Sequence, residues 1–218
     1  HGGSSATDSV DGSVAGDIFD GFDGAAAVAV GITGAAGKTA AAGNNSMFYT
    51  APELMDGLSL FASYNPQAHD GNEGEVGWGA TYTGVEGLTV SYATTDVNSG
   101  TAATSGDQTA WKASYAYGPV TVGASKSEHD TDTEASDTEL TAYSIAYTVS
   151  DELSVSYGVE ELTVGGTATD AEYSALVVAY TAGGLTLTAK AEDAENVNNT
   201  TAANADQEFW GLTAAFAF

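Results

Sequence analysis

The chain has 218 residues, of which 30 are Asp or Glu and four are Lys, and its formal charge is -26 at pH 7. The absence of Cys excludes a disulfide framework and a thiolate metal site, and the negative charge makes nucleic acid a poor partner because it repels phosphates. Hydrophobic residues make up 43% of the chain and 11 residues are Tyr, which argues against disorder.

Hydropathy excludes transmembrane helices but does not exclude transmembrane β-strands. No stretch of about 18 apolar residues occurs, so no transmembrane helix is predicted. A transmembrane barrel strand needs only about 10 residues of alternating polarity. The acidic composition fits equally well a secreted, salt-adapted β-sandwich or adhesin, so the pattern along the chain has to decide.

Residues 1–44 are rich in Gly, Ala, Ser and Asp, and only residues 25–32 show any alternation. We therefore predict a long ordered loop or a tail here rather than strands. This region carries five acidic residues: Asp8, Asp11, Asp17, Asp20 and Asp23.

From residue 45 onward, runs in which polar and apolar residues alternate are separated by connectors. Period-two alternation is typical of strands with two different faces. In the run 74–82, for example, Val76 and Trp78 alternate with Gly77 and Gly79. The run around Leu176 is apolar on both faces, and the first run can be read in either phase. Eleven strands are predicted, at 45–51, 58–65, 74–82, 88–95, 108–117, 120–127, 138–149, 153–160, 171–180, 185–192 and 207–218.

The connectors alternate between short and long, and one face of the runs carries mainly Ser, Thr, Gly and Ala. Alternating connector lengths predict an antiparallel meander whose two ends differ, as in outer-membrane barrels with short periplasmic turns and long external loops. No acidic residue falls in the middle of a run, which fits strands that face lipid on one side.

The tyrosines also follow the connectors, and we predict that they form two aromatic girdles at the membrane interfaces. The row beside the short turns is Tyr82, Tyr117, Tyr147 and Tyr180, and the row near the long-loop ends is Tyr64, Tyr92 and Tyr157.

Two segments resemble parts of a known family. The final residues 209–218, with Trp210, Leu212, Phe216 and Phe218 in one phase, resemble the terminal strand of Gram-negative outer-membrane proteins. The strand–turn–strand at 45–64 is similar to the segment that follows the constriction loop in the trimeric, sixteen-stranded general porins. The resemblance implies that Phe218 and Phe216 form the signal read by the barrel-assembly machinery.

The resemblance also implies a domain organisation. Residues 1–44 would correspond to the inward-folded constriction loop and residues 45–218 to the last eleven strands of a transmembrane antiparallel β-barrel, with the first five strands outside this sequence. In that family, acids on the loop oppose a basic cluster on the wall, so the five aspartates before residue 24 are candidate constriction residues. Lys112 and Lys190 fall in the small-residue phase and are expected to line the pore, whereas Lys126 is expected at the interface.

The sequence gives weaker indications of a metal site or a catalytic site. Asp130, Asp132 and Glu134 form an acidic run that could hold Ca²⁺ loosely, but the glycine of an EF-hand loop is absent and a hydrated loop is favoured. No other cofactor is predicted. No catalytic motif accompanies His69 or His129, so we do not expect an enzyme.

The sequence therefore predicts an outer-membrane porin: a homotrimeric, mildly cation-preferring diffusion channel for ions and small hydrophilic solutes, in contact with lipid and lipopolysaccharide. The alternative is the secreted acidic sandwich or adhesin.

Overall fold

The computed structural model describes residues 5–22, 46–66, 74–203 and 205–217, the side chains of residues 20 and 21 excepted. All eleven predicted strands are present in the described residues, together with three short 3₁₀ helices, η1 (Thr7–Ser9), η2 (Ile18–Phe22) and η3 (Glu134–Ser136). None of the described helices is long and apolar enough to cross a membrane. The strands are β1 (Met47–Thr50), β2 (Leu58–Asn65), β3 (Glu75–Tyr82), β4 (Leu88–Val97), β5 (Gly106–Tyr117), β6 (Val120–Thr131), β7 (Thr138–Thr148), β8 (Leu153–Val164), β9 (Ala171–Ala182), β10 (Leu185–Glu195) and β11 (Gln207–Phe216).

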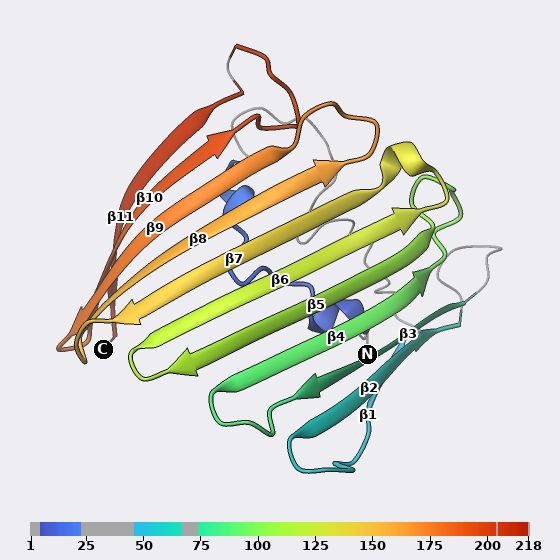
Figure 1. Ribbon diagram of the computed structural model, residues 1–218, viewed down its shortest axis with the longest axis horizontal. Helices are drawn as coiled ribbons and strands as arrows, with labels where there is room; N and C mark the ends of the chain where they lie inside the picture. Colours follow the sequence, from blue (N-terminus) through green and yellow to red (C-terminus); the bar gives the residue numbers. More distant parts are fainter. Residues whose placement is uncertain (1–4, 23–45, 67–73, 204, 218) are drawn as a thin grey trace.

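The strands form one antiparallel sheet in which every strand pairs with its neighbours in the sequence (Figure 1). The predicted meander is therefore confirmed, and the sheet is open, with β1 and β11 at its edges. Short turns join the strands at one end and longer connections join them at the other. One of the two-residue turns, between β9 and β10, contains Gly183 and Gly184, both with positive φ (59° and 82°), the conformation that a type I′ turn requires.

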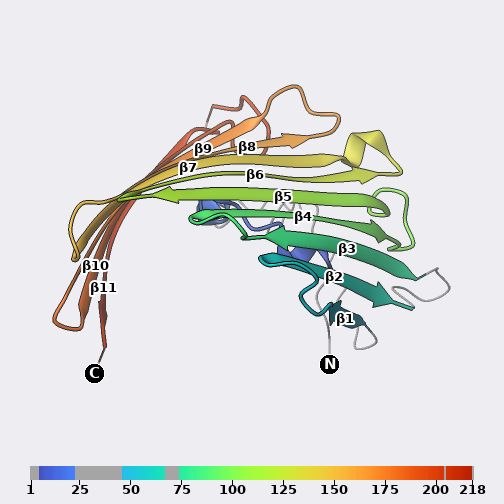
Figure 2. The same ribbon diagram turned by 60° about the horizontal axis from the view of Figure 1, so that its bottom comes forward.

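The sheet curves into an arch (Figure 2). The side chains on its two faces differ in chemistry. Large side chains such as Trp78, Ile145 and Leu212 are exposed on the convex face. The concave face carries buried Ser, Thr and Gln side chains, among them Thr95, Gln108 and Ser125. A β-sandwich would cover the large side chains with a second sheet, whereas the described strands all belong to a single sheet.

The register settles the two runs that the sequence left open. Leu176 pairs with Tyr157 and is exposed on the convex face, so its neighbour Val177 faces the concave side. Phe48 pairs with Ser63 on the concave side and stacks on Phe61, with 5.7 Å between the ring centroids.

Several strands extend further toward the long connections than the alternation predicted, and this corrects part of the aromatic assignment. β4 continues to Val97 and β8 to Val164, so Tyr92 and Tyr157 lie in mid-strand rather than near long-loop ends. Polar residues and acids continue the hydrogen-bonded ladder there, because the ladder joins backbone groups and does not require apolar side chains. Asp96, Glu161 and Asp193 are examples of acids inside these extensions.

Candidate pore constriction

Residues 5–22 lie beneath the arch, against the concave face of the sheet (Figure 2). Hydrogen bonds hold the start of this inward segment to the wall. The Ala6 N–H donates to Ser63 Oγ on β2 at 2.9 Å, and Thr7 Oγ1 lies 3.1 Å from both Thr95 Oγ1 on β4 and Gln108 Oε1 on β5. These hydrogen bonds support the predicted inward course of residues 5–22.

A buried carboxylate holds the middle of the inward segment. Glu160 on β8 is 2% exposed, and it accepts hydrogen bonds from Ser13 Oγ at 2.5 Å and from the Phe19 N–H at 3.1 Å. Charge-assisted hydrogen bonds of this kind are roughly twice as strong as neutral ones. Glu160 therefore fixes both sides of the bend between residues 13 and 19.

An apolar cluster holds the end of the inward segment. The ring of Phe22 lies 5.8 Å from the ring of Tyr173 on β9, and that of Phe19 lies 6.4 Å from it in an edge-on arrangement. Ile18, Leu140 and Leu162 also belong to this cluster. Tyr173 is one of the few large side chains on the concave face, and only the phase of its run distinguishes it in the sequence from the outward tyrosines.

Three wall glycines make room for the inward segment. A Cβ at Gly77 would lie 2.9 Å from the Cβ of Ala6, one at Gly123 would lie 3.0 Å from the Cβ of Val14, and one at Gly158 would lie 2.7 Å from the Cβ of Ala15. Carbon atoms do not approach this closely without a shift of the backbone. The small residues of the concave face thus give the inward segment its closest approach to the wall.

We expect Gly158→Val to displace the inward segment at Ala15, because overpacking of this kind typically costs about 1–3 kcal/mol. The measurable result is faster proteolysis within residues 5–22 of the folded protein. Ser156→Val is the matched control, since Ser156 lies on the same face of β8 two positions earlier and pairs with Ala146 and Val177. Equal proteolysis of the two variants would contradict the close packing at Gly158.

The five candidate constriction aspartates have different surroundings. Asp8 is partly buried, and its Oδ2 accepts a hydrogen bond from the Ser5 N–H at 2.9 Å. Asp11 and Asp17 are partly exposed, and Asp17, which has φ 52°, accepts a hydrogen bond from the Ser13 N–H at 3.0 Å. The side chain of Asp20 and all of Asp23 lie outside the described residues.

The two lysines expected to line the pore lie on the concave side. Lys112 Nζ lies 3.4 Å from the position that a Cβ would take on Gly12 of the inward segment. Lys190 Nζ forms an ion pair with Glu192 at 2.7 Å and lies 5.7 Å from the ring centroid of Phe209. Glu160, Glu192 and Lys112 therefore bring fixed charge of both signs to the concave side.

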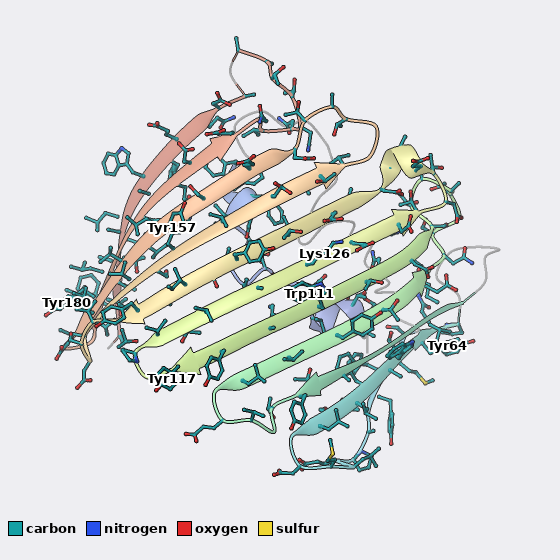
Figure 3. All side chains as sticks on the ribbon, in the orientation of Figure 1. Tyr64, Trp111, Tyr117, Lys126, Tyr157 and Tyr180 are labelled. Atoms are coloured by element: carbon teal, nitrogen blue, oxygen red, sulfur yellow. The ribbon has the colours of Figure 1, made fainter. Side chains whose placement is uncertain are left out.

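Lys126 lies on the convex face beside Trp111, with which it pairs across β5 and β6 (Figure 3). Its Nζ forms ion pairs with Glu128 at 2.9 Å and with Glu139 at 3.1 Å, near the long-connection end of the sheet. The prediction from sequence named the outward position but not these carboxylate partners.

The predicted aromatic, assembly and calcium residues are placed as follows. Tyr117, Tyr147 and Tyr180 are exposed beside the short turns, with Tyr82 at the end of β3, and Tyr64 lies near the other end of the sheet (Figure 3). Phe216 is exposed and ends β11, whereas Phe218 lies outside the described residues.

The described residues contain no group of three or more His, Cys, Asp or Glu arranged to hold a metal ion. Asp130, Asp132 and Glu134 are therefore not brought together as a metal site.

Comparison with known proteins identifies the family. A family model described as Gram-negative porin matches residues 3–181. The chain belongs to the Gram-negative porin family. It is therefore a protein of the bacterial outer membrane, and its strands are those of a porin barrel.

Solved porins share the fold of this porin chain at low sequence identity. A porin structure refined at 1.8 Å resolution is 21% identical, with a TM-score of 0.58 over 78% of this chain and 60% of that one. An anion-selective porin from Comamonas acidovorans is 14% identical, with a TM-score of 0.56 over 80% of this chain and 56% of that one. The trimer form of OmpT from Vibrio cholerae is 19% identical, with a TM-score of 0.53 over 78% of this chain and 64% of that one.

A search of curated protein sequences gave no significant match. The chain spans about 60% of the length of the first of these porins.

Proposed function

We propose that this porin forms a water-filled channel for passive diffusion of ions and small hydrophilic solutes, narrowed by residues 5–22. The observation that carries the proposal is the inward segment itself, held against a concave wall of hydroxyl-bearing and small residues by Glu160 and Tyr173. A buried hydrophobic core would require large apolar side chains along this whole face. Instead the largest apolar side chains cover the convex face, as a lipid-facing surface requires.

We further propose a mild preference for cations. Asp11 and Asp17 lie on the inward segment, and Lys190, one of the two described lysines on the concave side, is already paired with Glu192. A ring or cluster of fixed carboxylates at a narrow point raises the local concentration of cations and lowers that of anions. A solved porin with this fold is anion-selective, so the fold alone does not impose a preference for cations, and the preference is argued here from the residues of this chain.

The double variant Asp11→Asn, Asp17→Asn is expected to reduce the preference for cations. Asn keeps the shape of each side chain and tolerates the positive φ of residue 17, so the backbone should not change. The measurement is the reversal potential of the intact protein in planar bilayers under a salt gradient. Asp132→Asn, in an exposed connection beyond β6, is the control, and equal reversal potentials for both variants would contradict a constriction role.

A homotrimer is also proposed for the intact porin, on the likeness to the trimeric OmpT structure and to the general porins. The long connections carry much of the acidic charge, and contact with lipopolysaccharide there would require divalent cations between carboxylates and lipid phosphates. Chemical crosslinking in native outer membranes would test the trimer, with bands at the mass of one subunit alone as the contrary result.

A further inference from the structure

The inward segment is attached to the wall in two parts by different kinds of contact. Residues 5–10 are held by neutral hydrogen bonds to side chains of β2, β4 and β5, and by the buried side chain of Val10. Residues 13–19 are held by the carboxylate of Glu160 and by the apolar cluster around Tyr173. The second attachment therefore depends on an ionised side chain of the wall, and the first does not.

Glycines allow these two parts to move relative to each other. Gly12 lies between them, and a Cβ placed there would meet only the flexible end of Lys112 among the described residues. Gly16, at the exposed tip of the second part, has a φ of 98°, and a Cβ there would meet no described atom within 4 Å. Glycine adopts many backbone conformations at little steric cost. Residues 13–19 can therefore leave the wall without displacing residues 5–10.

Glu160 is a buried carboxylate held by hydrogen-bond donors alone. It accepts from Ser13 Oγ and from the Phe19 N–H, one on each oxygen. Among the described residues, no Lys or His forms an ion pair with it. A protonated carboxyl group turns one of its oxygens into a hydroxyl donor, so protonation removes one of the two acceptors and the charge that strengthens both bonds. The attachment of residues 13–19 is therefore strongest while Glu160 is ionised.

The groups packed around Glu160 do not balance its charge. On the inward segment, Asp17 accepts a hydrogen bond from the N–H of the same serine whose hydroxyl donates to Glu160. On the wall, the cross-strand partners of Glu160 are an alanine of β7 and Tyr173 of β9. The buried Glu192 of β10 is already paired with Lys190. A proton is therefore the simplest way to neutralise Glu160 where it lies.

We propose that Glu160 is an acid-sensitive latch, whose protonation lets residues 13–19 leave the wall more often while residues 5–10 stay attached. The apolar cluster around Tyr173 still holds the second part, so acid changes how often it opens and does not release it permanently. The latch itself concerns the position of the segment. Its effect on ion flow rests on the proposed channel function, in which each opening of the segment widens the path and raises the mean current.

Hydrogen–deuterium exchange of the intact, refolded porin in detergent tests the latch. Exchange is measured at about pH 7 and at about pH 4, a span that reaches the ordinary titration range of Glu, and is corrected for the intrinsic effect of pH. In the wild type, protection of residues 13–19 should fall by about tenfold or more in acid, because two charge-assisted hydrogen bonds lose their charge. Protection of residues 5–10 should change much less.

Two variants remove the latch from opposite sides. Glu160→Gln should show low protection of residues 13–19 at both pH values, because the charge is absent throughout. Ser13→Ala removes one of the two hydrogen bonds from the side of the inward segment. It should show a smaller loss of protection in acid than the wild type, and it provides the test where Glu160→Gln fails to fold.

Two controls keep Glu160 and remove other acids. Asp17→Asn removes the carboxylate that also accepts from Ser13, and Glu161→Gln removes the adjacent one, which is exposed on the convex face. Both controls should keep the loss of protection in acid.

Protection of residues 13–19 that does not depend on pH in the wild type, or that falls equally in the wild type and in Glu160→Gln, would overturn the latch. Planar-bilayer currents of the same proteins separate the latch from the channel function. Acid-dependent exchange with an unchanged current would support the latch and contradict the channel.

Discussion

Replacing Leu176 by Arg is expected to lower the free energy of unfolding by about 2–4 kcal/mol in lipid bilayers. Leu176 lies in the middle of β9 on the convex face, where it is 46% exposed and pairs with Tyr157. In a porin this position faces hydrocarbon, and a guanidinium group there loses its hydration without gaining a partner. Denaturant unfolding of the protein in lipid vesicles measures the effect.

Ala179→Arg is the control for this prediction, because Ala179 lies on the same strand but on the opposite, concave face. It pairs with Ser154 and Thr188, so an Arg side chain there reaches the polar interior. We expect a change of about 0.5 kcal/mol or less, as at other solvated positions. Equal destabilisation by the two substitutions would contradict the assignment of the convex face to lipid and the concave face to water.

Replacing Glu160 by Gln is expected to loosen the inward segment and to produce a larger, noisier single-channel current. Hydrogen bonds to a charged group contribute about 1.5–3 kcal/mol each, and neutral ones about 0.5–1.5 kcal/mol. Gln cannot accept from both Ser13 Oγ and the Phe19 N–H with a carboxylate's strength. The segment should therefore leave the wall more often, and each departure widens the path for ions.

Glu161→Gln provides the matched control, since it removes the same charge from the adjacent residue, which is exposed on the convex face. Its current in planar bilayers should resemble that of the wild type in amplitude and noise. If Glu160→Gln gave a quiet channel of wild-type conductance, the carboxylate would not be what holds residues 13–19 in place.

The strand pattern was predictable because it is local. Each of the eleven strands overlaps a run of period-two alternation, and the phase of Val76 and Trp78 correctly named the face that is exposed. The ends of strands were less predictable, as Tyr92 and Tyr157 show, because polar residues continue the ladder beyond the apolar band. Period-two polarity reports the environment of a strand and not where its hydrogen bonds end.

The residues that hold the inward segment were not predictable individually. Glu160 ends one alternating run and looks in the sequence like the acids of the long connections, yet it is buried and bonded to residues 13 and 19. Gly158 likewise looks like any small residue of its phase, although it lies against Ala15. Their importance depends on which distant segment they meet.

The amino-acid sequence by itself determined the number and order of the strands and the short and long ends of the meander. It also determined which side chains face outward, except in the first run and in the run around Leu176. It could do so because neighbouring strands pair with one another and because alternation repeats every two residues. Only the tertiary structure decided that Glu160, Tyr173 and Gly158 are wall positions that receive residues 5–22. The physical reason is sequence separation: Ser13 and Glu160 are 147 residues apart, and no periodic pattern encodes such a contact.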